Sequence, residues 1–382
     1  MIRFENVVKQ YPNGFRAVDG LDLQIAEGEI CVLIGPSGCG KTTSMRMVNR
    51  LIDLTSGRIV VDGRDNREIP AEELRRKIGY AIQQIGLFPH MTIYDNVAIV
   101  PHLLGWEETR IRKRVDRLLE LVGLDPDTNR DKYPRQLSGG QQQRVGVARA
   151  LGADPPIMLM DEPFGAIDPI TRDVLQDEFL QIQKEISKTI IFVTHDIDEA
   201  IKMGDRIAIL RAGKLVQYDT PDTLLAHPKD RFVRDFVGAD RQLKRLGLVR
   251  VRDIMNDEPP KVFYNGKIED ALREINRLQV RSAFVVDKSG RLRGWVDRES
   301  AEESTSLVEA MYEAHYSDIA VNEHATVRDA LSNMVARGFR VTPVVDLAGK
   351  LTGSITLKAL QELVERSSSD SADKQDEAAA MV

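Results

Sequence analysis

The stretch Ile30–Thr42 reads ICVLIGPSGCGKT and places an apolar run directly before a glycine-rich loop. The loop Gly35–Thr42 fits the pattern G-x-x-x-x-G-K-[ST], whose glycines let backbone N–H groups turn inward around phosphate oxygens. Lys41 would place a cation on those phosphates, and the Thr42 hydroxyl would ligate Mg²⁺. A chance fit is the alternative, but the apolar run before the loop and the helical run after it favour phosphate binding. The candidate phosphate-binding residues are Gly35, Pro36, Ser37, Gly38, Cys39, Gly40, Lys41, Thr42 and Thr43.

Two further apolar runs, Ile157–Met160 and Thr189–Val193, also end at polar residues. From residue 1 to about 235, such runs alternate with amphipathic stretches, which predicts an α/β domain with a largely parallel sheet. Open parallel sheets bind their ligands at the carboxyl ends of the strands. We therefore expect the chemistry of this domain to lie at these three strand ends.

Asp161 and Glu162 follow the second run and would bring two carboxylates to the phosphates. There, Asp161 would hold Mg²⁺ through water, and Glu162 would polarise the water that attacks the terminal phosphate. Taken alone, the pair could also be a solvated acidic turn. His195 follows the third run and would hydrogen-bond the same phosphate, although a lone histidine is usually structural or exposed.

The segment Leu137–Arg144 reads LSGGQQQR and contains a second glycine-rich helix start. A Ser-Gly-Gly turn that opens a helix forms an anion-binding N-terminus. One ATP does not need two such cradles in one fold, so this cradle is expected to face the terminal phosphate held by another copy. We therefore predict a head-to-tail homodimer with two ATP molecules between its subunits. The alternative is a glycine-rich helix start without a ligand.

This segment resembles the LSGGQ signature of ABC transporter ATPases, and the resemblance covers residues 1 to about 235. It implies that Tyr11 stacks on adenine, that Gln83 senses Mg²⁺ and the permease, and that Asp168 is the D-loop aspartate. The D-loop reads Gly165-Ala166-Ile167-Asp168 rather than Ser-Ala-Leu-Asp, and a second glutamine, Gln84, follows Gln83. The resemblance implies that the catalytic residues are Glu162, His195 and Gln83. It implies that Mg²⁺ is held by Thr42, Gln83 and Asp161. The further residues that it places against ATP are Tyr11, Ser138, Gly139, Gly140, Gln141 and Asp168.

Beyond about residue 240 the sequence repeats itself at an offset of 59 residues. The segment 290–294, GRLRG, recurs as 349–353, GKLTG, and the segment 285–287, VVD, recurs unchanged as 344–346. We therefore predict two copies of one small β-α-β unit. Phe284 is matched by Pro343, and a proline there predicts the start of a strand rather than its middle.

The two copies resemble a pair of CBS domains, and the segment 83–90, QQIGLFPH, is similar to the osmoprotectant branch of ABC importers. That branch moves glycine betaine, choline, carnitine and proline betaine. The implied fold is a P-loop NTPase ABC ATPase domain of the α/β class, followed by an α+β tandem CBS pair. Ser300 and Ala359 replace the ribose-contacting aspartate of nucleotide-binding CBS domains, which argues against nucleotide binding at this place.

The expected boundaries follow from the motifs and the repeat. They are 1–238 for the ATP-binding domain, 239–250 for a linker, 251–308 and 309–366 for the CBS domains, and 367–382 for a disordered acidic tail. The tail is rich in Ser, Ala and Asp and has no apolar period.

Composition narrows the class of protein further. A net charge of −6 with 29% charged residues argues against a nucleic-acid partner. No stretch approaches the roughly 18 apolar residues of a membrane span, and the first residues lack a signal-peptide core. Cys31 and Cys39 alone give neither a disulfide framework nor a metal-ligand spacing. The resemblance to ABC importers implies a peripheral protein on the cytoplasmic side of the bacterial plasma membrane, bound to permease subunits and served by an extracytoplasmic solute-binding protein.

One segment has the opposite charge balance. Residues 241 to 298 hold 14 Lys and Arg against 8 Asp and Glu, a net of +6. Attraction to anionic lipid that weakens with salt is one interpretation, and an ordinary solvated surface is the other.

Three rival functions remain at this point. The ATPase could energise uptake of another small solute, such as an amino acid. It could serve DNA repair or translation, although members of that kind typically carry a long coiled-coil insertion or two fused motor domains. It could also be a regulatory module that only senses ATP, which the presence of Glu162 argues against.

Overall fold

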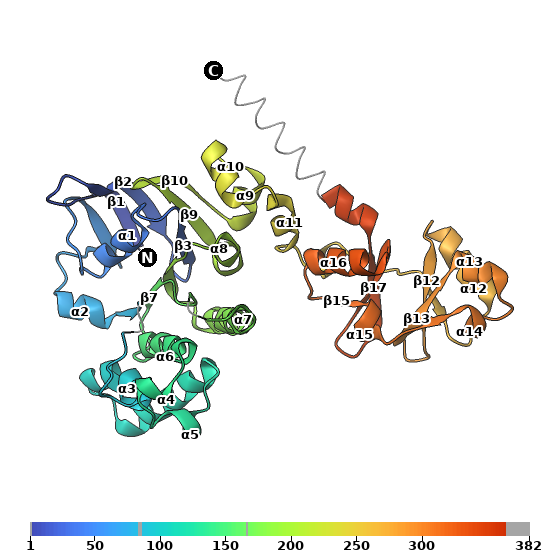
Figure 1. Ribbon diagram of the computed structural model, residues 1–382, viewed down its shortest axis with the longest axis horizontal. Coiled ribbons are helices and arrows are strands. Elements are labelled where there is room, and N and C mark those ends of the chain that lie inside the picture. The colour runs from blue at the N-terminus through green and yellow to red at the C-terminus, as the bar shows by residue number, and fades with distance from the viewer. Residues whose placement is uncertain (1, 83–85, 166, 364–382) are drawn as a thin grey trace, which may run out of the picture. The chain divides into compact units, whose positions relative to one another are not determined.

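The computed structural model describes residues 2–82, 86–165 and 167–363. Internal contacts divide the chain into two units, with the change between residues 224 and 237 (Figure 1). In the described residues, no helix combines the length and the apolar character that crossing a membrane requires. The predicted tail, 367–382, lies outside the described residues.

The main sheet of the first unit has the strand order β10-β9-β3-β8-β7-β6. All neighbours in it run parallel except β9 and β10, which form an antiparallel pair. The strands β3, β7 and β8 are buried along their whole length, as runs of apolar residues in a covered parallel sheet should be. This confirms the predicted parallel sheet and its three core strands. The bounds are β3 (Ile30–Ile34), β6 (Ile78–Ala81), β7 (Ile157–Asp161), β8 (Thr189–Val193), β9 (Arg206–Arg211) and β10 (Lys214–Asp219).

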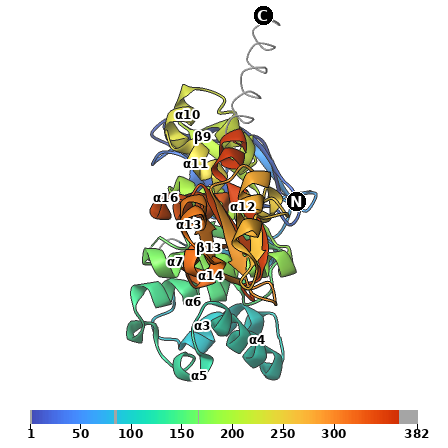
Figure 2. The same ribbon diagram turned by 90° about the vertical axis from the view of Figure 1, so that its right-hand side faces the viewer.

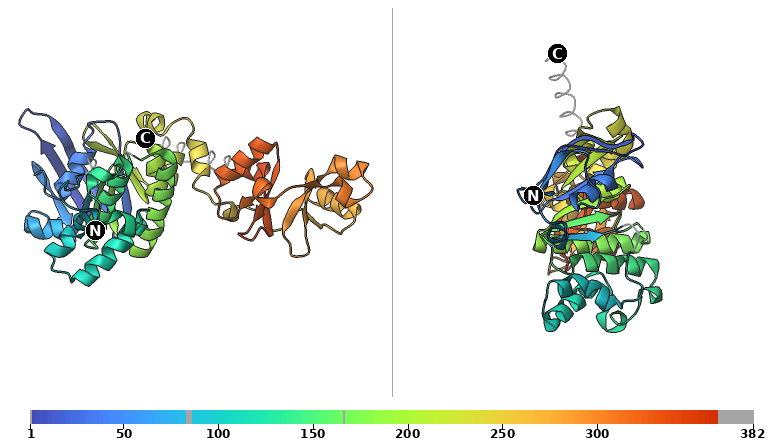
Figure 3. Two further views of the ribbon diagram at one scale, coloured as in Figure 1. Left: turned by 60° about the horizontal axis from the view of Figure 1, so that its bottom comes forward. Right: turned by 90° about the vertical axis from the view of Figure 1, so that its left-hand side faces the viewer.

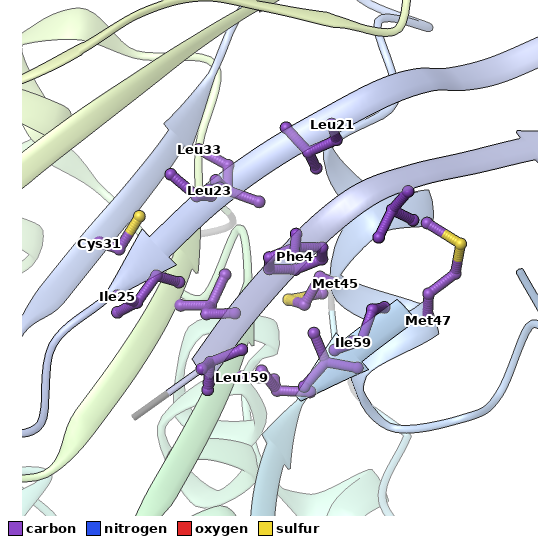
Figure 4. Close-up of a cluster of buried hydrophobic side chains, with 14 of the residues drawn as sticks. Phe4, Leu21, Leu23, Ile25, Cys31, Leu33, Met45, Met47, Ile59 and Leu159 are labelled. Atoms are coloured by element: carbon purple, nitrogen blue, oxygen red, sulfur yellow. The ribbon is translucent and has the colours of Figure 1, made fainter. Parts of the chain in front are cut away.

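A second, antiparallel sheet packs on the first, and no pattern in the sequence predicted it. Its order is β2-β1-β4-β5, with β1 (Ile2–Gln10), β2 (Arg16–Ile25), β4 (Ser56–Val61) and β5 (Arg64–Asp65). Alternate residues of these strands join the buried cluster that also takes Leu33, Leu159 and Met45 from the main sheet and from α1 (Lys41–Val48) (Figure 4). The two sheets therefore share one core, and α1 is anchored in it.

The helices α3 (Ile93–Leu103), α4 (Glu108–Leu121), α5 (Pro126–Asn129) and α6 (Gly139–Leu151) gather at one end of this unit (Figure 2). In α4 the buried residues Ile111, Val115 and Leu118 recur at helical spacing, which gives the helix one apolar face. The helix α6 packs on α3, α4 and β6. The remaining helices of the ATPase region are α2 (Ala71–Arg76), η1 (Pro134–Gln136), α7 (Pro169–Ile186), α8 (Ile197–Met203), α9 (Pro221–Ala226) and α10 (Arg231–Val237).

The second unit contains the predicted repeat (Figure 3). The elements β11 (Lys261–Phe263), α12 (Ile268–Arg277), β12 (Ser282–Val286) and β13 (Leu292–Asp297) recur as β15 (Val321–Asn322), α16 (Val327–Arg337), β16 (Val341–Val345) and β17 (Leu351–Thr356). Both hairpins have the same irregularity, between Val285 and Val286 and between Val344 and Val345. The repeat is therefore confirmed. The other elements are α11 (Arg241–Leu246), η2 (Val251–Asp253), α13 (Arg298–Glu303), α14 (Leu307–Ala310), β14 (Tyr312–Glu313) and α15 (Tyr316–Ile319).

The prediction that Pro343 starts a strand is wrong, because Pro343 is the third residue of β16. Its counterpart Phe284 donates its backbone N–H to Pro260, just before β11. Proline has no N–H to donate. The parallel partner β15 accordingly pairs only from Val344 onward, one residue later than β11 pairs with β12. A proline fits inside this strand because its nitrogen faces a position where the neighbouring strand has not begun.

The two sequence copies also differ from the two structural halves. Val251, which opens the predicted first copy, is buried in the core of the second repeat together with Val327 and Ile355. Ala310, which belongs to the predicted second copy, is buried in the core of the first repeat. The segment 239–250 does not act as a plain linker, because its helix α11 packs on α16 and buries Leu246 in that same second core.

Candidate functional site

The site lies where β3, β8 and β7 end side by side. Leu33 of β3 pairs with Val193 of β8, and Val193 pairs with Asp161 of β7. Because these strands run parallel, the residues that follow them leave the sheet at the same edge. The structure thus brings together the glycine-rich loop, the two carboxylates and the histidine, as the sequence predicted.

The glycine-rich loop has a backbone that requires glycine. Gly35 and Gly40 have φ values of +151° and +104°. A Cβ atom would lie 2.1 Å from the Leu210 carbonyl oxygen at Gly35 and 2.4 Å from the Ala17 carbonyl oxygen at Gly40. Any side chain at either position would force the loop away from the sheets beneath it.

Lys41 is buried at the start of α1 and points back into this loop. Its ammonium donates hydrogen bonds to the Gly35 carbonyl at 2.7 Å and to the Pro36 carbonyl at 3.2 Å. The cation is thus held inside the loop, within reach of a phosphate that the loop would bind.

Thr42 and Asp161 form a pair of oxygen donors that fits Mg²⁺. The Thr42 hydroxyl donates to Oδ1 of Asp161 at 3.1 Å. Asp161 is only 1% exposed, and its second oxygen, Oδ2, is buried without a hydrogen-bond partner among the described residues. Burial raises the pKa of Asp161, and a cation beside Oδ2 would oppose that effect by favouring the carboxylate. Oxygen ligands on one or two side chains, completed by phosphates and water, are what Mg²⁺ takes in such sites.

Glu162 and His195 form a pair at the open edge of the site. Nδ1 of His195 lies 3.2 Å from Oε1 of Glu162, and the side chains are 69% and 22% exposed, respectively. A carboxylate at this place can polarise a water molecule, and the exposed imidazole can reach a phosphate.

The glycine-rich segment around Ser138 does not join this edge. Ser138 caps α6: its Oγ accepts the Gln141 backbone N–H at 3.3 Å, and Oε1 of Gln141 accepts the Ser138 N–H at 2.9 Å. Ser138 and Gly139 are exposed, and Gly140 is half-buried. We call α6 the signature helix; its start is presented to solvent, where a second molecule can reach it.

Asp168 and Tyr11, two further predicted ligands, lie outside the helices and strands. Asp168 caps α7 by accepting the Thr171 backbone N–H at 3.0 Å, and this bond lowers the pKa of Asp168. Tyr11 follows β1, and its ring stacks on Phe15 with centroids 6.5 Å apart. Gln83, Gln84 and Ala166 lie outside the described residues.

Two buried polar residues near the site, Gln143 and Glu199, were not predicted from the sequence. Gln143, in the signature helix, donates its Nε2 to the Glu162 carbonyl at 3.0 Å. Glu199, in α8, accepts hydrogen bonds from the Thr194 hydroxyl and, at 3.0 Å, from Nε2 of Gln176. Burial raises the pKa of Glu199. Both lie within a few residues of a recognised motif, but only their burial reveals what they contact.

Comparison with known proteins agrees with this geometry. Residues 18–165 match the ABC transporter family, and residues 251–311 and 315–366 match the CBS domain family. The chain is 48% identical to the glycine betaine/carnitine/choline transport ATP-binding protein OpuCA of Bacillus subtilis, over 95% of this chain and 96% of that protein. It is 44% identical to the osmoprotectant import ATP-binding protein OsmV of Salmonella typhimurium, over 93% and 94% of the two chains.

Solved structures extend the likeness to the fold. A dimeric bacterial ABC transporter cassette superposes with a TM-score of 0.54 at 35% identity, over 58% of this chain and 98% of that one. A dimeric ATP-binding cassette in a post-hydrolysis state, bound to ADP and Pi, also gives a TM-score of 0.54, at 34% identity over the same shares. The predicted class, a P-loop ATPase fold followed by paired CBS domains, is confirmed.

The contacts of Glu199 predict a pH-dependent effect of the substitution Glu199→Gln, which keeps the shape and removes the ionisable group. Since the folded pKa is raised, the stability contributed by this group is complete below the unfolded pKa and is lost as pH rises through the folded pKa. Relative to wild type, the thermal midpoint of Glu199→Gln should therefore increase as the pH rises above about 4, the ordinary pKa of a glutamate. Glu72→Gln on the exposed α2 controls for the loss of one charge, and a difference independent of pH would contradict the expectation.

Proposed function

This chain belongs to the family of ABC transporter ATP-binding proteins, and on that premise we propose that it drives the import of quaternary ammonium osmoprotectants through a separate membrane permease. It is an ABC-type ATPase. The Glu162–His195 pair, at the strand edge that also holds the glycine-rich loop, carries the ATP-hydrolysing part of the proposal. Glycine betaine, choline and carnitine are the expected solutes, because relatives that share almost the whole length of this chain are named for them.

In the proposed mechanism, Lys41 exchanges its carbonyl partners for the β and γ phosphate oxygens of ATP. Thr42 and Asp161 would hold Mg²⁺, which neutralises phosphate charge when bound. Glu162 polarises the attacking water, and His195, paired with Glu162, hydrogen-bonds the γ phosphate. Gln83 is proposed to join Thr42 and Asp161 in holding Mg²⁺ and to join Glu162 and His195 as a catalytic residue. Tyr11 is proposed to stack on the adenine ring.

Two copies would close on two ATP molecules. The exposed start of the signature helix, with Ser138, Gly139 and Gly140, would meet the γ phosphate in the partner's glycine-rich loop. The dimeric form of the similar solved cassettes supports this arrangement. Closure on ATP and reopening after hydrolysis would then supply a two-state switch.

A groove beside the signature helix is the proposed docking face for the permease. It has a volume of about 910 Å³ and combines exposed apolar residues with arginines. An amphipathic helix end with apolar anchors fits such a lining. Docking there would hold the chain on the cytoplasmic face of the membrane, with a solute-binding protein on the other side of the permease. The groove is lined in part by Arg46, Leu51, Phe88, Ile99, Leu103 and Arg149.

The basic segment 241–298 would lie against anionic lipid and sense salt through it. Several of its cations are already paired, including Arg277 with Glu274 and Arg293 with Glu313. The attraction would therefore fall mainly to exposed lysines such as Lys261 and Lys288. Because the Debye length shortens from about 10 Å at 0.1 M salt to about 3 Å at 1 M, this contact would loosen as ionic strength rises.

ATP turnover should depend on Glu162. Glu162→Gln keeps the size of the side chain and removes the base, so kcat should fall by a factor of about 100 or more. The affinity for ATP should stay within about twofold, because Lys41 and the glycine-rich loop are untouched. Turnover would be measured by phosphate release and affinity with a fluorescent ATP analogue. Equal turnover by the variant and the wild type would exclude the assigned role.

Coupling to the permease should depend on the groove. Leu103, which is 65% exposed, would lie against the permease, so Leu103→Glu should abolish co-purification with it and stop uptake of labelled glycine betaine. Leu347→Glu changes a still more exposed leucine, 87% exposed, in the hairpin between β16 and β17, and should leave both co-purification and uptake intact. A competition experiment tests the rival amino-acid function. If an unlabelled amino acid suppresses the uptake of labelled glycine betaine and unlabelled choline does not, the rival function is favoured.

The response to salt should depend on the second unit. Replacing Lys261, Lys267 and Lys288 by glutamine, or removing residues from 240 onward, should flatten the dependence of glycine betaine uptake on ionic strength in vesicles containing anionic lipid. Vesicles of neutral lipid are the control and should show the flat response with the wild type. An unchanged salt response in both variants would end the sensing proposal.

A further inference from the structure

The side chain of Gln143 connects the signature helix to the main chain of Glu162. Its Nε2 donates to the Glu162 carbonyl oxygen at 3.0 Å, and the residue is only 5% exposed. Gln143 lies five positions after Ser138, the N-cap of the helix, which is about 7.5 Å along the axis. A short rigid stretch of helix therefore joins the exposed start of α6 to a buried contact with the catalytic glutamate.

Glu162 has a backbone conformation that needs such support. Its φ is +48°, in the left-handed region that a residue with a Cβ atom rarely adopts. Its N–H donates to the Val193 carbonyl at 2.9 Å, and its own carbonyl accepts the Gly165 N–H at 3.2 Å as well as the Gln143 amide. One of these three bonds therefore comes from the signature helix, and the direction of the carboxylate follows the torsion angles that they hold.

We propose that Gln143 is a positioning residue that couples the start of the signature helix to the catalytic carboxylate of the same subunit. The inference rests on the proposed function, in which Ser138, Gly139 and Gly140 meet the ATP bound by the partner while Glu162 acts on the ATP of its own subunit. Ordering of the helix start by the partner's nucleotide would fix the Glu162 carbonyl through Gln143. Occupancy of one ATP site would thereby set the catalytic competence of the other.

The first test removes the amide donor and keeps the length of the side chain. Gln143→Met should lower kcat about tenfold or more, because Glu162 would lose one of the bonds that hold its orientation. KM and the affinity for a fluorescent ATP analogue should stay within about twofold, since no phosphate-binding group changes. A kcat within twofold of wild type would overturn the proposal.

Gln183→Met is the matched control. Gln183 is also buried, at 7% exposure, and donates its Nε2 to the backbone carbonyls of Gly28 and Lys188, away from the strand edge that carries Glu162. Gln183→Met also loses the hydrogen bond that Oε1 of Gln183 accepts from the Lys188 backbone N–H at 3.2 Å, so its thermal stability should fall at least as much as that of Gln143→Met. Only Gln143→Met should lose kcat, and an equal loss in both variants would assign Gln143 a purely structural role.

A second variant keeps the proposal testable if Gln143→Met folds poorly. Gln143→Glu preserves the shape of the side chain; its ionised form sets oxygen against oxygen at the Glu162 carbonyl, and its protonated form can donate. The ratio of variant to wild-type kcat should therefore rise as the pH is lowered. A ratio that is constant with pH would contradict the hydrogen-bonding role.

Coupling itself is measured by a double-mutant cycle with Ser138→Ala. If Gln143 transmits the engagement of the helix start, the double variant should lose less kcat than the product of the two single losses. Losses that multiply would overturn the coupling. Absence of ATP turnover in the wild type would instead refute the proposed function, so the two failures are distinguishable.

Discussion

Strand β8 lies between β3 and β7, and its hydrogen bonds to both strands set the spacing of the groups that handle phosphate. Neighbouring strands are about 4.8 Å apart, so the glycine-rich loop after β3 and the carboxylates at the end of β7 lie about 10 Å from each other along the sheet edge. His195 leaves it between them. This spacing suits a nucleotide phosphate and its cation, and it is enforced by backbone bonds that no single side chain can alter.

The antiparallel sheet and its shared core hold that edge in place from below. Phe4, Ile59 and Met45 are fully buried against Leu33 and Leu159, so α1 and the loop before it cannot shift independently of the strands. The close approach of the Leu210 carbonyl to Gly35 comes from the main sheet, in which β9 pairs with β3 up to Ile34. The helices α3, α4 and α6 pack on one another, and α6 also packs on β6 at the edge of the main sheet.

The polar groups buried near the site differ in their hydrogen-bond partners, and the difference indicates a different role for each group. The Glu199 carboxylate accepts two side-chain hydrogen bonds, which ties α7 and α8 to the end of β8. The Gln143 side-chain amide donates a hydrogen bond to the main-chain carbonyl of Glu162. Oδ2 of Asp161, by contrast, has no protein partner among the described residues. A buried oxygen without a hydrogen bond is costly, and a bound cation would remove that cost.

The sequence by itself determined the strands that end at the site, the glycine-rich loop, the carboxylate pair and the repeat, because each is encoded locally by apolar runs, by glycines or by recurrence at a fixed offset. It did not determine which strands are neighbours, so the second sheet and the place of β8 between β3 and β7 emerged only from the fold. The sequence also did not show that Val251 is buried in the core of the second repeat and Ala310 in the core of the first. An apolar residue does not encode which of two similar cores will bury it. The contact between Gln143 and Glu162 depends on two segments that are distant in the chain and meet only through packing of α6 on the sheet. Local chemistry is encoded in short motifs, whereas partners across the fold are selected by the burial of surfaces that only the complete tertiary structure brings together.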